Sequence, residues 1–564
     1  MSVATSTRRY AIGAEPLPAG GVSFRIWAPD HSEATLMVED LTGQQRSMSM
    51  RADGEGYFAV EDEHAKSGDR YGFGLGRQTR LLPDPASRFQ PDGPEGLSEL
   101  VDQQTYAWRD EAWPGVKLPG QVIYELHVGT FTSEGTWDAA ARGLDELADL
   151  GITLLEVMPV NEFVGSFGWS YDGVNLFAPT RLYGRPDDFR RFVDKAHAVG
   201  VGVLLDVVYN HFGNCGNCFQ QFTKRYFTDR YKNEWGEAIN FDGPGSRGVR
   251  EFFLTNVRYW IDEFHVDGFR IDATQQFFDE SETHILTELT QAARAAAKKP
   301  ILLIAENEPQ NVRMVRPAER GGHGMDAVWN DDFHHSAMVR LTGSTDGYYH
   351  DYRGHASEFV AMAKRGYLYQ GQRYPWQNKR RGTPTTGLSA PTFVNYLQNH
   401  DQIANSARGE RAHRLTGPAR YRAMTGLFLL MPQTPLIFQG QEFCASTPFL
   451  YFNDSSGEIG QSVIAGRKKF LRQFKSLATP EIQAQLIDPT ERETFERCKL
   501  IPSKRQAHQQ WRLLHKDLLR LRREDPVFRC QDAKQLDGSA ITGDALLLRY
   551  FDEAGEDRLV IRTA

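Results

Sequence analysis

The sequence lacks the features that a secreted or membrane protein would need. Cysteine is scarce, with five scattered residues in 564, which argues against a disulfide framework and fits a reducing compartment. The longest apolar run, from Leu427 to Met431, is closed by Pro432 and is too short to cross a bilayer. The N-terminal segment has two arginines but no apolar stretch after them, so it is not a signal peptide. We therefore expect a cytoplasmic protein without a membrane partner.

Excess positive charge is also missing. Lysine and arginine together number 65 against 73 aspartates and glutamates, which gives a formal net charge of -8. No run of basic residues stands out along the chain. Phosphate backbones would not be attracted to such a surface, so we expect no nucleic-acid partner.

Metal and redox motifs are sparse. Cys215 and Cys218 form a single C-x-x-C pair, and without a second pair or a nearby histidine pattern we interpret it as an ordinary loop. The chain has no Asp-x-Asp-x-Asp loop of the calcium-binding type. We expect neither a bound metal nor a cofactor.

The first hundred residues have the pattern of short β-strands. GGVSFRIWAP alternates Val22, Phe24 and Ile26, and GDRYGFGLG is a second candidate strand, as in a sheet with one buried face. A proline-crowded stretch from residue 83 to 94 follows, which is typical of a linker. We predict an N-terminal β-sandwich over residues 1–110, with its boundary near Trp113.

From Gln121 onward, apolar strand candidates alternate with amphipathic segments such as PDDFRRFVDKAHAVG. This alternation is typical of a parallel sheet built from βα units. Eight units predict an α/β fold with a closed (β/α)8 TIM barrel over residues 111–462, a count that the family resemblance described below also guides. The eight predicted strands are QVIYELHV, ITLLEVMPV, VGVLLDVV, VDGFRID, PILLIAENE, MDAVWND, TFVNYLQNHD and TPLIFQGQE.

The rest of the chain is predicted to be an appendage of the barrel. Residues 463–530 have a basic helical pattern, clearest in LLHKDLLRLRREDP, so we predict a helical extension there. ALLLRYFD and DRLVIR then predict two strands. We expect residues 531–564 to form a small, shortened C-terminal β-domain.

Polar side chains stand at the ends of four predicted barrel strands. In a (β/α)8 barrel these ends converge around one opening, where the reactive groups of such enzymes lie. We therefore expect one pocket to receive carboxylates from several strands. The strand-end residues are Asp206, Asn210 and His211 in DVVYNH, Arg270 and Asp272 in GFRIDA, Glu306 in AENE, and His400 and Asp401 in NHDQ.

Two of these carboxylates suit the cleavage of a glycosidic bond. That reaction needs an acid for the leaving oxygen and, for retention, a carboxylate that attacks the anomeric carbon. Asp272 and Glu306 lie 34 positions apart (306 minus 272), about one βα unit, so adjacent strand ends would present them to each other. Arg270 shares a strand face with Asp272 and would keep it ionised, whereas Glu306 must hold its proton. Asp401 and the histidines would hold sugar hydroxyls.

Tyr171 is the candidate aromatic platform for a sugar. It lies in GWSYDG, after the second predicted strand, and an exposed aromatic side chain at the loop end of a barrel can stack on a sugar ring. Trp260 and Phe264, by contrast, are expected to pack in the core.

Taken together, DVVYNH, GFRIDAT, AENE and NHDQ resemble the four signature regions of the α-amylase family of glycoside hydrolases. Within that family, YELHVGTFT, WSYDGVNLFAPTRLYG, NDDFHHSAMVRLTG and GQEFCASTPFLYF resemble the trehalohydrolases that act on maltooligosyltrehalose. The segment SFRIWAP is similar to the immunoglobulin-like sandwich, of the carbohydrate-binding-module type, that precedes the barrel in this group.

The resemblance implies a retaining hydrolase that cleaves the α-1,4 bond beside the terminal trehalose of a maltooligosyltrehalose, releasing trehalose. It implies that Asp272 is the nucleophile, Glu306 the general acid/base and Asp401 the transition-state stabiliser. It further implies substrate-binding positions, which for the cleaved sugar are Asp206, His211, Arg270 and His400, and for the trehalose side are Asp331 and Asp332.

Three alternatives share parts of this pattern. A glycogen branching enzyme would pass the glucan to another chain, and a general α-1,4-glucan hydrolase would ignore trehalose. A non-catalytic glucan-binding protein would usually have lost a carboxylate, and all three remain here. ATQQ after Asp272 and NEP after Glu306 depart from many relatives, so they bear on substrate preference. The oligomeric state is left open between a monomer and a homodimer.

Overall fold

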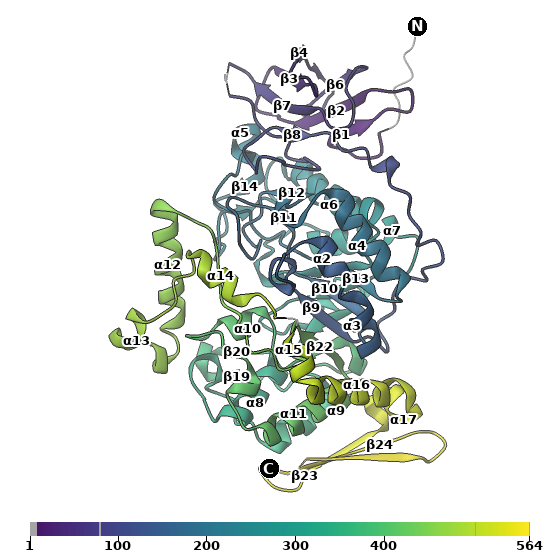
Figure 1. The fold of residues 1–564 in the computed structure, drawn as a ribbon, viewed down its shortest axis with the longest axis vertical. Helices are drawn as coiled ribbons and strands as arrows, with labels where there is room; N and C mark the ends of the chain where they lie inside the picture. The colour runs from purple at the N-terminus through teal and green to yellow at the C-terminus, as the bar shows by residue number, and fades with distance from the viewer. Residues whose placement is uncertain (1–7, 78–79, 502, 563–564) are drawn as a thin grey trace.

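The computed structural model describes residues 8–77, 80–501 and 503–562. Figure 1 shows a β-sandwich at the top, a barrel in the middle and a small sheet at the bottom, near the C-terminus. The predicted division at residues 1–110, 111–462, 463–530 and 531–564 remains a proposal, and its outer ends, 1–7 and 563–564, lie outside the described residues. No helix within the described ranges combines the length and apolar character that a bilayer span requires.

The N-terminal part is a sandwich of two four-stranded antiparallel sheets, ordered β1-β2-β6-β5 and β4-β3-β7-β8. The alternation in VSFRIW is confirmed, because Phe24 and Ile26 are fully buried and pack with Leu36 and Phe73 of the facing sheet. The strands are β1 (Gly13–Pro16), β2 (Val22–Trp27), β3 (Ala34–Glu39), β4 (Gln45–Ser49), β5 (Arg51–Ala52), β6 (Tyr57–Asp62), β7 (Arg70–Leu75) and β8 (Ser98–Glu99).

The predicted eight-stranded barrel is confirmed. Each predicted segment contains one strand, all neighbours are parallel, and the ring closes where the last strand pairs with the first. The barrel strands are β9 (Ile123–Leu126), β10 (Leu154–Val157), β13 (Gly202–Val207), β16 (Gly268–Ile271), β17 (Leu302–Ala305), β18 (Ala327–Trp329), β21 (Phe393–Tyr396) and β22 (Thr434–Phe438).

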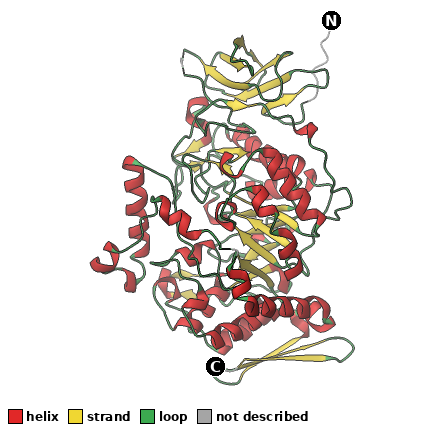
Figure 2. Cartoon of the chain, in the orientation of Figure 1, coloured by secondary structure: helices red, strands yellow, loops and turns green. Residues whose placement is uncertain are grey.

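Helices surround these strands, as Figure 2 shows in red around the yellow barrel. In α4, Pro186 occupies the first turn and the Asp188 side chain caps the helix start. Its Phe189 and Phe192 are fully buried, as their helical spacing predicts. The longer helices near the barrel are α3 (Leu144–Leu150), α4 (Pro186–Ala198), α6 (Ser246–Phe264), α7 (Ile285–Ala296), α8 (Asp331–Thr342), α9 (Ala356–Arg365), α11 (Pro418–Leu430) and α16 (Gln509–Glu524).

Helix α16 completes the outer layer although it comes long after the last barrel strand. It packs against α3 and α11, where Leu519 is buried in the main core. The buried Arg522 guanidinium donates to the carbonyl oxygens of Leu429 and Gln433 at 3.1 and 2.6 Å, which anchors the helix to the end of α11.

The remaining elements are short helices, two-stranded sheets and an outlying helical group that projects to the left in Figure 1. The helices are α1 (Val128–Phe131), α2 (Trp137–Ala141), α5 (Phe219–Phe222), α10 (His400–Ala404), α12 (Gly457–Leu471), α13 (Pro480–Ala484), α14 (Arg492–Cys498), α15 (Lys504–Ala507) and α17 (Pro526–Arg529). The strand pairs are β11 (Asn161–Glu162) with β12 (Asn175–Pro179), β14 (Phe227–Thr228) with β15 (Ala238–Ile239), and β19 (Arg373–Tyr374) with β20 (Lys379–Arg380).

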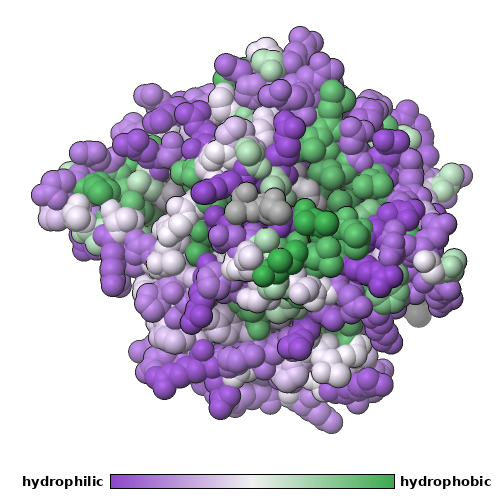
Figure 3. Space-filling model, turned by 90° about the horizontal axis from the view of Figure 1, so that it is seen from below, coloured by the Kyte–Doolittle hydropathy of each residue, from purple (hydrophilic) through white to green (hydrophobic). Residues whose placement is uncertain are grey.

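The C-terminal sheet has three antiparallel strands, β23 (Leu536–Ala540), β24 (Leu546–Phe551) and β25 (Asp557–Arg562). The prediction of two strands missed β23, because LDGSA lacks the β-branched and aromatic residues typical of strands. One face is buried, whereas Leu559 and Ile561 on the other are 54% and 58% exposed. Figure 3 views the molecule from this end and shows apolar surface gathered there.

Side chains that point into the barrel change from apolar to polar along the strands. Residues two apart in a strand share a face, so Ile123 and Glu125 on β9 both point inward, as do Leu154 and Glu156 on β10. The lower layer is a buried apolar cluster that includes Ile123, Leu154, Leu204, Leu302, Val394 and Leu436. Above it, towards the carboxyl ends of the strands, lie Glu125, Glu156, Asp206 and Arg270, all at most 1% exposed.

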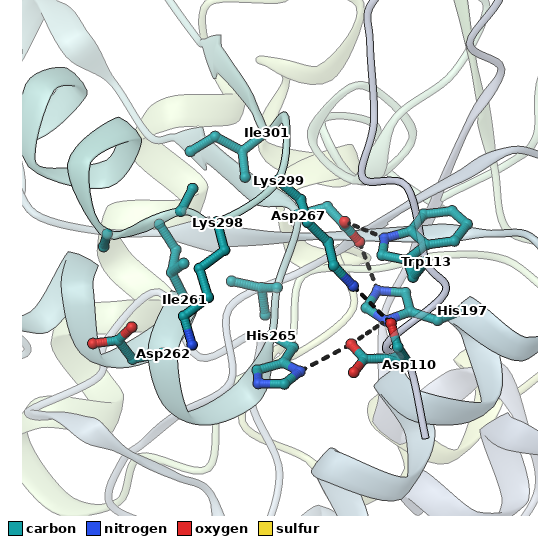
Figure 4. Close-up of a pocket in the computed structure, with 13 residues that line it drawn as sticks. Asp110, Trp113, His197, Ile261, Asp262, His265, Asp267, Lys298, Lys299 and Ile301 are labelled. Atoms are coloured by element: carbon teal, nitrogen blue, oxygen red, sulfur yellow. Dashed lines mark hydrogen bonds and ion pairs between the residues drawn. The ribbon is translucent and has the colours of Figure 1, made fainter. Parts of the chain in front are cut away.

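A charged cluster lies at the other end of the barrel, where the strands begin, and holds the segment that precedes the barrel in place (Figure 4). The His197 ring at the end of α4 lies between two carboxylates, with Nδ1 3.0 Å from Asp110 and Nε2 2.8 Å from Asp267. Trp113 stacks on that ring at 4.7 Å and donates from Nε1 to Asp267 at 2.6 Å. Because a neutral imidazole has only one N–H, contacts on both nitrogens favour the imidazolium.

Replacing His197 by alanine is expected to lower the free energy of unfolding by about 3 to 5 kcal/mol, because two buried carboxylates lose their cation. Burial lowers the pKa of His197, but Asp110 and Asp267 outweigh it and raise the pKa above its usual value. The stabilisation is therefore complete below about pH 6.5 and is lost as the pH rises through the raised pKa. Urea unfolding at pH 6 and pH 9 measures both effects.

The exposed His64 provides the control, since its side chain has no hydrogen bond within the described part of the chain. His64→Ala should leave stability unchanged at both pH values. An equal loss in both variants, or a loss in His197→Ala that does not shrink at pH 9, would rule out the charged cluster as the cause.

Candidate active site

The predicted strand-end residues meet at the carboxyl end of the barrel. Asp206 and Arg270 project from β13 and β16, where they are Cα partners in neighbouring strands. Asp272 follows β16 and Glu306 follows β17, while His400 and Asp401 open helix α10. The structure therefore brings the predicted strand-end residues together at one opening, as the sequence predicts.

The Arg270 guanidinium joins three of the carboxylates. Its Nη1 lies 2.8 Å from both oxygens of Asp206 and 2.7 Å from Oδ1 of Asp272, and its Nη2 lies 2.9 Å from Oε2 of Glu306. The Arg270 side chain is fully buried, whereas Asp272 and Glu306 keep 12% and 22% of their side-chain surface exposed. One rigid cation thus fixes the two candidate catalytic carboxylates at the edge of the same opening.

Glu306 is held by one oxygen only. Its Oε2 accepts from the backbone N–H of Ala273 at 2.8 Å and forms an ion pair with the Arg270 guanidinium at 2.9 Å, while Oε1 has no protein partner within the described residues. Burial is the largest influence on its pKa and raises it to about 7, with Asp272 and Asp401 adding to the rise and Arg270 opposing it. Glu306 can therefore carry a proton on Oε1 near neutral pH, as an acid for a leaving group must.

Asp272 has both oxygens occupied, by Arg270 on Oδ1 and by the Asn210 amide on Oδ2 at 2.9 Å. Burial raises the pKa of Asp272, while Arg270 and Asn210 lower it, and the net direction is upward. The expectation that Arg270 favours the ionised form is correct for that contact, but burial outweighs it. The two hydrogen bonds also fix the direction in which the carboxylate faces.

The residue after Asp272 has an unusual backbone conformation. Ala273 lies in the left-handed region with φ at 41°, which is costly for a residue with a β-carbon. In this conformation its N–H points to Glu306, at 2.8 Å. The strain therefore serves to connect the loops that carry the two candidate catalytic carboxylates.

Asp401 is the most open carboxylate of the group, with 40% of its side chain exposed, and lies 3.6 Å from Nε2 of His400. His400 itself is 1% exposed, and its Nδ1 contacts the Glu125 carboxylate at 2.5 Å. Sequence reasoning did not find Glu125, because a single glutamate in a strand gives no local signal of a partner 275 positions away.

Tyr171 differs from its prediction as an exposed platform. It is only partly buried, but its ring stacks on His400 at 5.1 Å and its hydroxyl donates to Oδ2 of Asp206 at 2.6 Å. It therefore belongs to the wall beside Asp206. A second aromatic residue that the sequence reasoning missed, Trp235, is 45% exposed and lies 5.9 Å from the ring of His211.

His211 lies at the edge of the same group. It is 6% exposed, and its Nδ1 is 2.6 Å from the Asn210 side-chain oxygen. Burial lowers the pKa of His211 to about 4, so the ring is neutral near pH 7 and can donate or accept one hydrogen bond at each nitrogen.

The two aspartates of NDDFHH have different surroundings. Asp331 keeps 18% of its side chain exposed, pairs with Arg381 at 3.1 Å and accepts from the Tyr396 hydroxyl. Asp332 is fully buried and accepts from the Tyr352 hydroxyl at 2.6 Å. The substrate-binding role of Asp332 stays a prediction; in this structure its side chain has no exposed surface and supports the fold beneath Asp331.

Arg381 also binds Glu308, two residues after Glu306, at 2.5 Å. The guanidinium is 2% exposed and reaches Glu308 and Asp331 from the loop that follows β20. No local pattern predicted this cluster, because Arg381 is distant in sequence from both carboxylates. Over the described ranges, no group of three or more His, Cys, Asp or Glu side chains is arranged to hold a metal ion.

Known proteins resemble this chain over nearly all its length. A family model described as the alpha-amylase catalytic domain matches residues 92–241. A malto-oligosyltrehalose trehalohydrolase from Deinococcus radiodurans is 42% identical over 97% of this chain and 88% of its own length, and one from Saccharolobus solfataricus is 41% identical over 80% and 79%. The crystal structure of a putative alpha amylase from Salmonella typhimurium superposes with a TM-score of 0.89 at 34% identity, covering 98% of this chain and 93% of that one.

Proposed function

This chain belongs to the malto-oligosyltrehalose trehalohydrolases of the α-amylase family, and from that premise we propose the reaction that its site performs. The enzyme hydrolyses the α-1,4-glucosidic bond next to the terminal trehalose of a maltooligosyltrehalose. The products are free trehalose and a maltooligosaccharide. The observation that carries the proposal is the Arg270 bridge, which holds Asp272 and Glu306 together at the barrel opening.

The proposed reaction has two steps with the same two carboxylates. The Asp272 carboxylate attacks the anomeric carbon, and Glu306 gives its proton to the departing glycosidic oxygen of trehalose. Glu306 then removes a proton from water, which attacks the same carbon and releases Asp272. Two inversions leave the anomeric configuration retained. The raised pKa of Glu306, about 7, suits a group that must donate and then accept a proton.

We assign the surrounding residues to the two sides of the cleaved bond. Asp401, the most exposed carboxylate of the group, is proposed to stabilise the transition state by holding hydroxyls of the reacting sugar. The proposed binding residues for that sugar are Tyr171, Asp206, His211, Arg270 and His400. Asp331 is proposed to face the trehalose, because its carboxylate is partly exposed, is anchored by Arg381 and follows β18, the barrel strand beside the one that precedes Glu306.

The predictions about cellular location, partners and oligomeric state are also proposals. A cytoplasmic location is supported by the absence of a disulfide among the five cysteines, all of which are free. A glucan substrate follows from the names of the relatives, and neither nucleic acid nor a membrane is proposed as a partner. We leave the oligomeric state between a monomer and a homodimer.

The proposal is tested by incubating the purified protein with maltotriosyltrehalose and, separately, with maltopentaose. Chromatography should find trehalose and maltotriose from the first and little product from the second. Proton NMR of the first minutes should show the new reducing end as the α-anomer, which is the sign of retention.

Each alternative gives a different result in the same assay. Comparable cleavage of both sugars would make the protein a general α-1,4-glucan hydrolase. Longer or branched products would indicate a glycogen branching enzyme. Binding of both sugars without any product from either would indicate a non-catalytic glucan-binding protein.

A further inference from the structure

Two carboxyl groups lie side by side inside the barrel, below the proposed catalytic centre. Glu125 on β9 and Glu156 on β10 are Cα partners in neighbouring parallel strands, and each is 1% exposed. Residues in register on adjacent strands point to the same face, so both side chains enter the barrel interior. Glu125 lies in YELHVGTFT, but neither residue belongs to the four signature regions that contain the proposed catalytic residues.

Glu125 binds His400 at two points. One carboxylate oxygen lies 2.5 Å from the His400 ring nitrogen Nδ1, and the other accepts from the His400 backbone N–H at 3.2 Å. Because His400 is the first residue of α10, this contact fixes both the ring and the start of the helix. The position of the next residue, Asp401, depends on the same contact.

The other ring nitrogen of His400 is directed to the substrate side. Nε2 lies 3.6 Å from Oδ2 of Asp401, which is too long for a hydrogen bond and leaves its N–H available for a sugar hydroxyl. Stacking on Tyr171 at 5.1 Å and an edge contact with Trp169 at 5.1 Å hold the plane of the ring. With a carboxylate on each side of the ring, both nitrogens are favoured to carry a proton.

Glu156 has the opposite surroundings. Both of its oxygens are buried without a hydrogen-bond partner in the described part of the chain. An ionised carboxylate in that position would be costly, so the neutral acid is favoured. Of the two neighbouring groups, Glu125 therefore carries the single negative charge, because it alone has a cation to bind.

We propose that Glu125 is a positioning residue of the reaction, which holds His400 as an imidazolium and aims its Nε2–H at the reacting sugar. Glu156 stays protonated and has no part in this. The proposal rests on the proposed function only in naming the sugar as the group that His400 meets. The protonation of His400 is measured independently of any activity.

The electrostatic environment agrees with this geometry. Burial lowers the pKa of His400, but Asp401 and Glu125 outweigh it and raise the pKa to about 9, with Arg270 opposing them. The titratable groups that face the ring come from several elements: Glu125 on β9, His127 after it, Glu156 on β10, Arg270 on β16 and Asp401 on α10.

Two variants with the same chemical change separate the roles of the two glutamates. Glu125→Gln removes the charge beside His400, whereas Glu156→Gln replaces one neutral group by another in the same layer. The titration of His400 is followed by NMR on protein labelled with 13C at the histidine ring carbons, and a His400→Gln variant identifies its signal. Maltotriosyltrehalose hydrolysis is measured in parallel from pH 5 to pH 9.

We expect His400 to titrate near pH 9 in the parent protein and in Glu156→Gln, and at least about one pH unit lower in Glu125→Gln. We expect kcat/KM of Glu125→Gln to fall by about 10- to 100-fold, as for the loss of one hydrogen bond to a charged group. The fall should grow as the pH rises from 6 to 8. Glu156→Gln should keep the parent profile.

The proposal is overturned if His400 titrates below about pH 6.5 in the parent, if Glu125→Gln leaves the titration unchanged, or if both variants lose activity equally. Should Glu125→Gln not fold, the parent titration decides alone. A parent that releases no trehalose but titrates as expected would remove the proposed function and leave the imidazolium in place.

Discussion

Asp272→Asn is expected to lower kcat for trehalose release from maltotriosyltrehalose by at least about 10⁴-fold, because an amide cannot form the glycosyl intermediate. The asparagine has the same shape and can still accept from Asn210 or Arg270, so the fold and the binding of substrate should survive. Stopped-time chromatography over hours measures the residual rate. Isothermal titration with maltotriosyltrehalose checks that the variant still binds.

The control for this variant is Asp145→Asn, which makes the same change at a side chain that is 66% exposed on the barrel surface. It should keep the parent rate. If Asp272→Asn kept more than about one hundredth of the parent rate, Asp272 would not be the nucleophile. In that case the Arg270 bridge would be an arrangement for binding only.

Glu306→Gln is expected to lower kcat/KM for maltotriosyltrehalose by about 10²- to 10⁴-fold, the usual contribution of general acid–base catalysis. Trehalose is a poor leaving group without a proton. The fluoride of an α-maltotriosyl fluoride leaves without a proton, so with this substrate the variant should still form the glycosyl intermediate. Hydrolysis of that intermediate should be slow, because no general base activates the water. Added azide, an anion that needs no general base, should restore turnover and give the α-glycosyl azide.

The pH dependence provides a second readout for Glu306. In the proposed mechanism Glu306 must be protonated in the free enzyme, so kcat/KM of the parent should fall as the pH rises through about 7, the pKa of this group. Glu306→Gln should lack that fall. Glu319→Gln, an exposed glutamate further along the same loop region, should keep the parent profile. Failure of azide to restore turnover would assign the acid role to another residue.

The individual barrel strands could be predicted because their information is local, whereas the count of eight was also guided by the family resemblance. Each strand is a short apolar run followed by polar residues, and the period of two within a strand decides which side chains share the interior. The positions of Asp206, Arg270 and Asp272 follow directly from that rule. Strand β23, the one C-terminal strand that was not predicted, could not be found in the same way. Its sequence has low strand propensity, and its backbone pairing with β24 compensates for this.

The parts of the site that escaped prediction depend on contacts between distant segments. The role of Glu125 depends on its contact with His400, and the role of Arg381 depends on its contacts with Glu308 and Asp331. The family resemblance implied a substrate role for Asp332 as well as for Asp331. On a helix, however, successive residues point in different directions, and Asp332 turns into the core.

The closure of the barrel has a consequence for how the chain folds during synthesis. In the closing strand pair, Glu125 of β9 and Phe438 of β22 are Cα partners, 313 positions apart (438 minus 125). Helix α16, which covers α3 and α11, follows some seventy residues later. One edge of β9 therefore stays unpaired until β22, and with it most of the protein, has left the ribosome. Contacts between such distant residues make folding slow, and the waiting edge is the place where a nascent chain would need protection from aggregation.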